Sequence, residues 1–257
     1  MTDLADDAAL AADLVREAGL MAQELRESGL QVDTKSSVSD VVTAADRAAE
    51  RLIVDHLAAF RPDDGVLGEE GNERPTVSGR TWIVDPVDGT YNFVHGLDWW
   101  CAAVALVEDD ASLVGAVYHP ASDALYVGGP HVPTTRDGMP VGPLVDVALA
   151  DTCVSTYLHP PFFDGAVGET FVRVVRGAAT LRMLGSGSMD LTAVAQGRLG
   201  VFVQHSVAPW DWWPGASLVL GAGGDARQLT RDDKVWSVAG APTAVAEACA
   251  LIEDVTS

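Results

Sequence analysis

Apolar and polar residues follow two different periods along the chain, and together these periods predict a mixed α/β protein. Residues 4–28 carry apolar side chains at three- and four-residue steps, the spacing of one face of a helix. A second helix is expected over about residues 40–60, where Arg61-Pro62 would end it. Residues 82–84 and 99–107 are continuous apolar runs, which are typical of buried strands.

A segment rich in Gly, Pro and Thr at residues 129–150 is the best candidate for an internal boundary. Strands are expected before it at residues 112–118 and 124–128, and helices after it at residues 166–176, 189–196, 210–220 and 243–252. We therefore expect a single domain over residues 1–257, with an N-terminal α+β part of about 1–140 and a C-terminal α/β part of about 141–257.

Composition and charge limit the classes of function. Hydrophobic residues make up 48% of the 257 residues, enough for a sizeable core, and no apolar run reaches the length of a membrane span. The first thirty residues lack the basic start and apolar stretch of a secretory signal. Sixteen Lys and Arg residues stand against 37 Asp and Glu, and the resulting charge of −21 argues against nucleic acid and membrane partners. An anionic substrate would then have to be attracted by bound cations.

Three cysteines, Cys101, Cys153 and Cys249, are odd in number and far apart in the sequence. This pattern fits buried thiols in a reducing compartment better than a disulfide framework or a zinc site. We therefore expect a cytoplasmic protein.

The segment Trp-Ile-Val-Asp-Pro-Val-Asp-Gly-Thr at residues 82–90 is the strongest candidate for a functional site. A buried strand that ends on Asp85 would present its carboxylate at the edge of the sheet, where open α/β sheets place their ligands. Pro86 would stiffen a tight turn that brings Asp85 and Asp88 into one space, where a cation would relieve their repulsion. We expect Gly89 to let a ligand approach the backbone and Thr90 to cap a short helix. The alternative interpretation is an ordinary exit from a strand into a loop.

Further acids and a small-residue segment lie elsewhere in the chain. Glu69 and Glu70 end a short predicted strand, and Asp211 lies near the start of a helix, where a negative charge is favoured. Thr43 and Asp46 are expected on one face of the second helix. Gly185-Ser186-Gly187-Ser188 leads into another helix.

Taken in order, Gly-Glu-Glu at 68–70, Asp-Pro-Val-Asp-Gly-Thr at 85–90, Gly-Ser-Gly-Ser at 185–188 and Trp-Asp at 210–211 resemble the inositol monophosphatase family of Mg²⁺-dependent, lithium-sensitive phosphatases. The resemblance spans nearly the whole chain, because Lys35, Thr43 and Asp46 also match. It implies a layered α-β-α-β-α sandwich, commonly assembled as a homodimer. It also implies a phosphomonoesterase that hydrolyses a small polyol or sugar phosphate by attack of a metal-activated water.

The resemblance also implies roles for individual residues. Glu69, Asp85 and the carbonyl of Val87 would bind one Mg²⁺, and Asp85, Asp88 and Asp211 a second. A third, weaker Mg²⁺ would contact Glu69. Asp46 and Thr90 would orient the attacking water, and the N–H groups of Gly89 and Thr90 would hold phosphate oxygens. Ser186, Gly187 and Gln204 fall in the phosphate- and substrate-binding set. All the proposed ligands are oxygen atoms, which Mg²⁺ prefers, and no histidine is required.

Two departures from the family pattern concern the substrate. Gln204 stands where an acid commonly bonds a substrate hydroxyl, and Trp212-Trp213-Pro214 follows the Trp-Asp motif where small residues are usual. Catalysis is therefore better supported than inositol as the substrate. Histidinol phosphate or another small monoester is the alternative substrate, and a non-catalytic regulatory or binding relative is the alternative class. His95 follows the acidic segment closely and is the histidine to examine.

Overall fold

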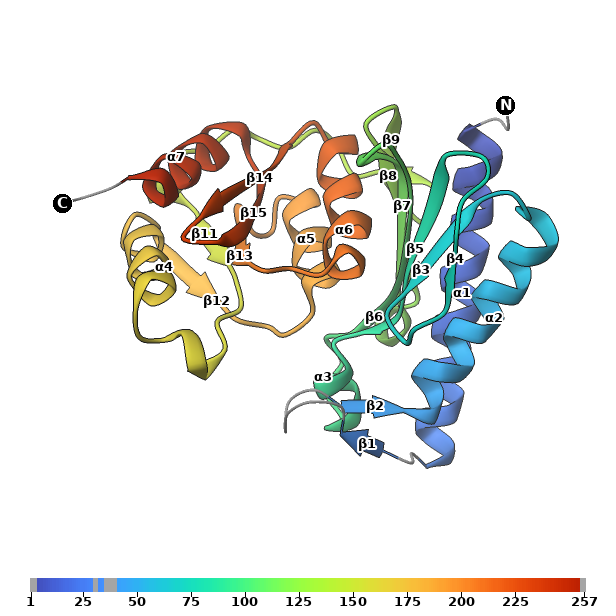
Figure 1. Ribbon diagram of the computed structural model, residues 1–257. Coiled ribbons are helices and arrows are strands. Elements are labelled where there is room, and N and C mark those ends of the chain that lie inside the picture. The colour runs from blue at the N-terminus through green and yellow to red at the C-terminus, as the bar shows by residue number, and fades with distance from the viewer. Residues whose placement is uncertain (1–3, 30–31, 35–40, 255–257) are drawn as a thin grey trace.

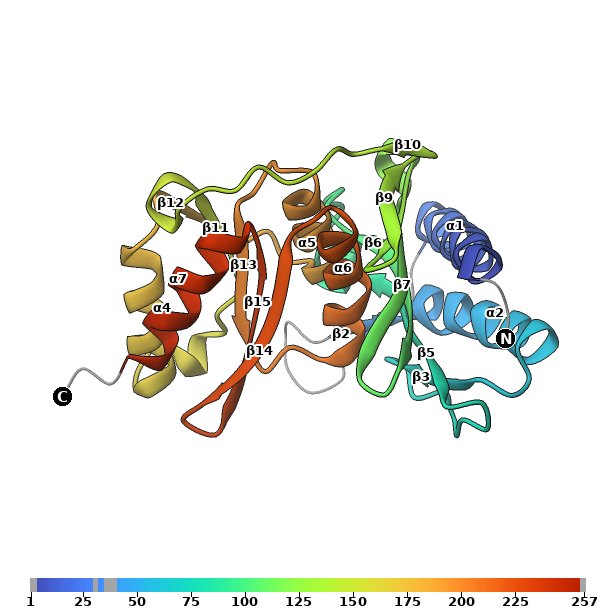
Figure 2. The same cartoon turned by 90° about the horizontal axis from the view of Figure 1, so that it is seen from above.

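The fold has five layers of helices and sheets. We analysed a computed structural model that describes residues 4–29, 32–34 and 41–254. Helices α1 (Leu4–Ser28) and α2 (Ala44–Phe60) cover one face of an eight-stranded sheet (Figures 1 and 2). Helices α5 (Gly187–Ala195) and α6 (Pro209–Gly221) lie between this sheet and a five-stranded one, whose outer face carries α4 (Ala166–Arg176) and α7 (Pro242–Glu253). The predicted α-β-α-β-α sandwich is confirmed.

The eight-stranded sheet is antiparallel except where β3 pairs with β5. Its spatial order is β10-β9-β8-β7-β6-β5-β3-β4. The strands are β3 (Gly65–Gly68), β4 (Glu73–Arg74), β5 (Arg80–Asp88), β6 (Cys101–Glu108), β7 (Ala111–His119), β8 (Ala124–Gly129), β9 (Val132–Arg136) and β10 (Met139–Pro140). Only Gly89 separates β5 from the short helix α3 (Thr90–Val94), and Asp85 and Asp88 lie at the end of β5.

The five-stranded sheet is mixed, with the order β12-β11-β13-β15-β14. Its strands are β11 (Cys153–Ser155), β12 (Thr180–Arg182), β13 (Val201–His205), β14 (Asp225–Arg231) and β15 (Lys234–Gly240). Short 3-10 turns occur at Pro120–Ser122, Leu149–Asp151 and Pro160–Phe162. Elsewhere β1 (Val32–Thr34) and β2 (Val41–Thr43) form a two-stranded antiparallel sheet.

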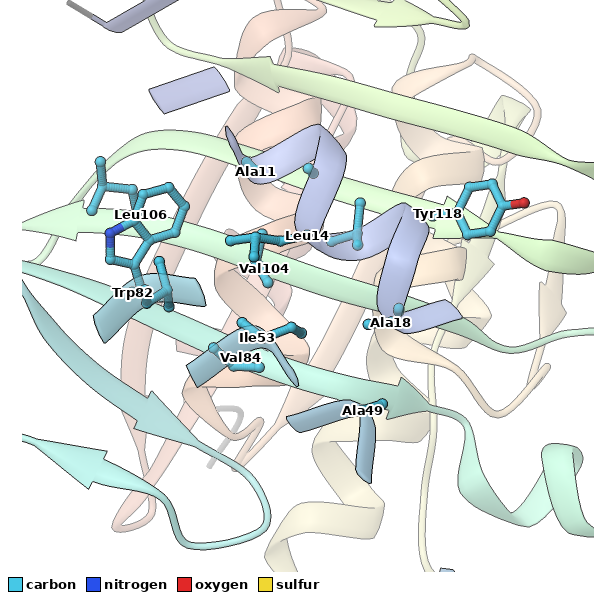
Figure 3. Packing of buried hydrophobic residues seen from close by; sticks show 14 of the residues in the cluster. Ala11, Leu14, Ala18, Ala49, Ile53, Trp82, Val84, Val104, Leu106 and Tyr118 are labelled. Atoms are coloured by element: carbon cyan, nitrogen blue, oxygen red, sulfur yellow. The ribbon is translucent and has the colours of Figure 1, made fainter. Parts of the chain in front are cut away.

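Apolar faces of α1 and α2 pack on the eight-stranded sheet and fix its position. Figure 3 shows Leu14 of α1 and Ile53 of α2 over Trp82, Val84 and Val104, and these five side chains are at most 1% exposed. The three- and four-residue steps seen in the sequence are therefore the buried face of α1. Truncating a side chain such as Leu14 to Ala in such a core costs about 2–5 kcal/mol.

The second helix begins later than the pattern predicts. Residues Val41–Thr43 form strand β2, and α2 starts at Ala44. Three consecutive β-branched residues favour extended backbone over helix, which explains the shift. The prediction that Thr43 and Asp46 share a helix face is therefore wrong, since only Asp46 lies on the helix.

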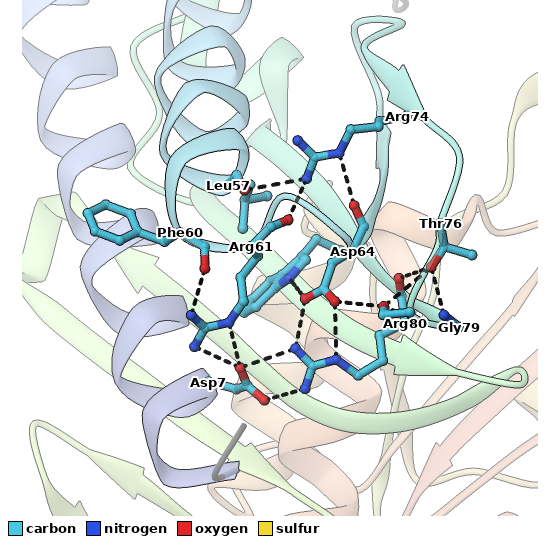
Figure 4. A network of polar contacts seen from close by, with 11 residues as sticks. Asp7, Leu57, Phe60, Arg61, Asp64, Arg74, Thr76, Gly79 and Arg80 are labelled. Carbon is cyan, nitrogen blue, oxygen red and sulfur yellow. Dashed lines mark hydrogen bonds and ion pairs between the residues drawn. The ribbon is translucent and has the colours of Figure 1, made fainter. Parts of the chain in front are cut away.

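A buried ion-pair network ties α1 to the beginning of β5 (Figure 4). Arg80 contacts Asp7 and Asp64, each with an N–O distance of 2.7 Å, and Arg61 contacts Asp7 at 2.9 Å. Asp64 also accepts hydrogen bonds from the Ser78 hydroxyl at 2.7 Å and the Trp82 indole N–H at 3.0 Å. Burial would raise the pKa of Asp64, but these bonds and the one from Arg80 lower it below the usual value.

We expect Asp64→Asn to reduce the free energy of unfolding by about 3 kcal/mol, because it leaves a buried guanidinium less compensated. A carboxyl with a lowered pKa stabilises the fold above its unfolded pKa of about 3.9, and this contribution disappears as the pH falls through the folded pKa. Urea unfolding should therefore show a difference between wild type and variant that shrinks below about pH 4.

Asp232→Asn is the matched control, because it breaks only the exposed Arg231–Asp232 pair. Its loss should stay below about 0.5 kcal/mol. Equal losses in the two variants would contradict a stabilising role for the network.

Candidate active site

Asp85 and Asp88 lie on the last part of β5 and are buried, with 1% and 4% of their surface exposed. The sequence predicts a tight turn after Asp85, but β5 continues through Pro86 to Asp88. The pairing of β5 with β6 shifts register between Asp85 and Asp88, so one strand carries an irregularity there. On a regular strand, side chains three residues apart point to opposite faces of the sheet. A bulge changes the direction of the side chains that follow it, so the two carboxylates can face one space without a turn.

Asp211 reaches the same space from the first turn of α6. Carboxylate oxygens of Asp85, Asp88 and Asp211 all lie within 4.8 Å of one another. The residue that caps α6 is Ala208, and Asp211 lies in the first turn of the helix, as the sequence predicts. The structure thus brings together acids that are more than 120 positions apart in the chain.

Glu69 joins this cluster from the turn after β3. It lines the same cavity as Asp88 and Asp211, and its charge acts on Asp85. The turn is held by Glu50 of α2, a buried residue that the sequence analysis missed. The Glu50 carboxylate accepts hydrogen bonds from the Glu70 N–H at 2.8 Å and from the Asn72 side chain at 2.7 Å. Glu50 lies four residues after Asp46 and therefore on the same face of α2, and this spacing was the signal in the sequence that could have identified it.

The electrostatics of the cluster follow from burial and like charge. Burial, with the charges of Glu69, Asp88 and Asp211, raises the pKa of Asp85 well above its usual value. Burial also raises the pKa of Asp88, although the backbone N–H groups of Ser188 and Gly187 partly offset this by donating to its carboxylate. A divalent cation would offset both the burial of these carboxylates and their mutual repulsion. A set made only of oxygen donors suits a hard ion such as Mg²⁺.

Thr90 contacts two other predicted residues. Its hydroxyl lies 3.3 Å from the Asp46 carboxylate and 3.0 Å from the Val87 carbonyl oxygen. Asp46 itself is fully buried. The prediction that Thr90 caps the short helix is wrong, because Gly89 is the cap and Thr90 is the first residue of α3. Gly89 has a φ of 91°, which glycine adopts without strain.

A cavity of about 380 Å³ opens beside these groups. Eight residues predicted from the sequence line it: Glu69, Asp88, Gly89, Thr90, Ser186, Gly187, Gln204 and Asp211. Asp85 belongs to the site through its neighbours Asp88 and Asp211, and Asp46 and Val87 belong to it through Thr90. Lys35 lies outside the described residues.

The cavity has lining residues that the sequence analysis did not single out. Tyr157 and His159 form an edge-to-face pair with ring centroids 4.6 Å apart. Further lining residues are Tyr91, Asn92, Met183, Leu184 and Asp190. No motif marks these positions, because the fold brings them together from four separate segments.

The remaining candidates lie in packing positions outside the cavity lining. His95 is exposed, stacks on Tyr91 at 4.0 Å between ring centroids, and contacts the Tyr91 carbonyl. Trp212 and Pro214 are buried and Trp213 packs on the core, so the unusual residues after the Trp-Asp motif fill space between the layers.

The raised pKa values of Asp85 and Asp88 predict the pH dependence of stability. The folded metal-free protein binds protons more tightly at these groups than the unfolded chain does, so its free energy of unfolding should fall as the pH rises above about 4. Added Mg²⁺ should largely remove this fall. Thermal unfolding between pH 5 and pH 8, in chelator and in Mg²⁺, measures both effects. A melting temperature that is independent of pH and of Mg²⁺ would contradict the assignment.

Comparison with known proteins gives a consistent result across the chain. The model of the inositol monophosphatase family matches residues 3–255. The inositol-1-monophosphatase of Rhizobium meliloti is 41% identical over 195 residues, covering 72% of this chain and 71% of its own. The fructose-1,6-bisphosphatase/inositol-1-monophosphatase of Thermotoga maritima is 33% identical over 193 residues, covering 75% and 73%.

Solved structures agree with these relatives. The extragenic suppressor protein suhB of Bartonella henselae superposes with a TM-score of 0.85 at 25% identity, covering 96% of this chain and 98% of its own. The family match spans both sheets and all the acids of the cluster. This chain therefore belongs to the inositol monophosphatase family.

Proposed function

We propose that this protein is a Mg²⁺-dependent phosphomonoesterase that hydrolyses a small polyol or sugar phosphate. The observation that carries the proposal is the convergence of the Asp85, Asp88 and Asp211 carboxylates within 4.8 Å beside an open cavity. Relatives named as inositol-1-monophosphatases support the reaction class.

The acids divide into two overlapping cation sites in this proposal. Glu69, Asp85 and the Val87 carbonyl would hold one Mg²⁺, and Asp85, Asp88 and Asp211 the second. A third, weaker ion would contact Glu69. When bound, Mg²⁺ supplies a Lewis acid that polarises the phosphoryl group and makes water easier to deprotonate.

Thr90 and Asp46 hold the attacking water and take its proton. The Thr90 hydroxyl has a single proton, which it shares between the Asp46 carboxylate at 3.3 Å and the Val87 carbonyl at 3.0 Å. When it donates to Asp46, the lone pairs on its oxygen are free to accept from a water. Asp46 is the last acceptor in this series of hydrogen bonds, which runs from the water through Thr90. The burial of Asp46 keeps solvent away from these bonds.

The phosphate end is bound by backbone donors at the beginning of α3. The first N–H groups of a helix have no intrahelical partner, so those of Gly89 and Thr90 are placed to hold phosphate oxygens. Ser186 and Gly187 line the same cavity. A side chain at position 89 would meet Ser186 and the carbonyls of Trp99 and Gly185 at 3.1–3.2 Å, which explains the glycine.

The leaving-group end of the cavity favours substrates with a single phosphate. Among the described residues that line it, no Lys or Arg is present to hold a second phosphate. Gln204 offers an amide, and Tyr157 and His159 offer ring faces, which suit the hydroxyls and C–H faces of a cyclic polyol.

The family resemblance supports two further properties of the enzyme, and its cysteines support a third. We expect it to be inhibited by lithium and to form a homodimer. Cytoplasmic location is supported by its three free thiols, which fit a reducing compartment.

The direct test is turnover of phosphate monoesters after chelation and after Mg²⁺ is restored. We expect hydrolysis of a polyol phosphate such as inositol 1-phosphate to stop in chelator and to return with Mg²⁺. Undiminished turnover in the chelated sample would rule out the proposed chemistry.

Gln204 should set the preference between leaving groups. An amide does not attract a cationic leaving group, so the wild type should favour a neutral polyol phosphate over histidinol phosphate. Gln204→Glu should shift the ratio of kcat/KM toward the amine by about 1–3 kcal/mol if the new pair is shielded from water. Gln228→Glu on β14, outside the cavity lining, is the control. An unchanged ratio in Gln204→Glu would place residue 204 outside the substrate contacts.

A further inference from the structure

The proposed metal centre is assembled from two parts of the fold. Asp85 and Asp88 belong to the eight-stranded sheet, whereas α5 and α6 lie in the layer between the sheets (Figures 1 and 2). The first N–H groups of α5 contact the centre directly. Gly187 N–H donates to one Asp88 oxygen at 3.2 Å, and Ser188 N–H donates to the other. The orientation of Asp88 therefore depends on where α5 begins.

Asp190, one turn into α5, is bonded to both sheets. One of its carboxylate oxygens accepts from the Trp99 indole N–H at 2.8 Å, just before β6 of the eight-stranded sheet. The other accepts from the hydroxyl of Ser155, the last residue of β11 in the five-stranded sheet. Asp190 is 2% exposed and lies at the wall of the cavity. A buried carboxylate with a donor from each sheet fixes the helix between them.

Further hydrogen bonds hold the start of α5 in place. The Asn92 side chain of α3 donates to the carbonyls of Trp99 and Leu184, each at 2.8 Å. Leu184 directly precedes the Gly185–Ser188 segment that opens α5. The start of α5 is thus held at its loop by Asn92 and at its first turn by Asp190.

We propose that Asp190, through Trp99 and Ser155, is a positioning residue that holds the start of α5 against Asp88 and so presets this carboxylate for divalent cations. Asp190 itself binds neither metal nor phosphate in this proposal. Its loss should therefore weaken metal binding and leave the chemical step intact once the metal sites are full. Outer partners of metal ligands typically contribute about 10–100-fold to metal affinity.

The chain provides a matched control at the other end of β5. Asp64 is also a buried aspartate that accepts one hydrogen bond from a Trp indole and one from a Ser hydroxyl. It contacts Arg80 at the beginning of β5, roughly 25 Å of strand away from Asp88 at its end. Asp64→Asn and Asp190→Asn therefore make the same chemical change at two buried aspartates, the first far from the metal centre and the second near it, although Asp64 also pairs with Arg80.

The experiment measures Mg²⁺ affinity by calorimetry without substrate, and Mg²⁺ activation and kcat with a phosphate monoester. Asp190→Asn and Trp99→Phe should raise the dissociation constant of Mg²⁺ about tenfold, with kcat at saturating Mg²⁺ within about twofold of wild type. Asp64→Asn should lower the melting temperature and leave Mg²⁺ affinity unchanged.

Unchanged Mg²⁺ affinity in Asp190→Asn and Trp99→Phe would overturn the inference, as would an equal loss of affinity in Asp64→Asn. The kinetic half of the test rests on the proposed function, but calorimetry does not. If the wild type hydrolyses no monoester, the proposed function fails while the metal-binding comparison still decides the role of Asp190.

Discussion

Mutual repulsion of buried carboxylates is the constraint on which the rest of this structure depends. The carboxylate oxygens of Asp85, Asp88 and Asp211 lie within 4.8 Å of one another, and Asp85 and Asp88 are buried, where like charges interact far more strongly than in solvent. Helix, sheet and loop contacts around them must supply the free energy that keeps them together. The same repulsion would be relieved by a divalent cation between these acids, and this is the physical basis of the proposed metal sites.

Different layers of the fold carry different residues of the candidate site. The eight-stranded sheet, through β3 and β5, carries Glu69, Asp85 and Asp88, while Asp46 and Glu50 reach in from α2 on one side. The central helices bring Asp211 and the start of α5 from the other side. Gln204, Tyr157 and His159 come from the five-stranded sheet and its loops and line the same cavity. In the proposed function they contact the leaving group, so substrate choice would depend on other parts of the fold than metal binding does.

Periodicity is a local property, and it was enough to predict α1 and the buried strands. The five-layered sandwich and the convergence of Asp88 with Asp211 agree with what the resemblance of the ordered motifs to the family implies, since periodicity alone does not choose this fold. The course of β5 through Pro86 was missed, since a bulge opposite β6 depends on the partner strand. Glu50 and Asp190 were missed because their hydrogen-bond partners are distant in sequence. Tyr157 and His159 are only two residues apart, but no sequence pattern indicates that they line the cavity. Only tertiary packing distinguishes Asp190, Tyr157 and His159 from ordinary helix or loop residues.

In the proposed site, acids from two layers of the fold share divalent cations. This sharing can be observed by anomalous diffraction from crystals of the protein soaked in Mn²⁺, a hard cation with oxygen preferences like those of Mg²⁺. We expect one peak bounded by Asp85, Asp88 and Asp211 and another bounded by Glu69, Asp85 and the Val87 carbonyl, with the first peak lost in Asp88→Asn. Mn²⁺ peaks found only elsewhere in the protein would contradict the proposed site. Hydrolysis of a monoester by crystals that hold no Mn²⁺ at these acids would contradict it as well.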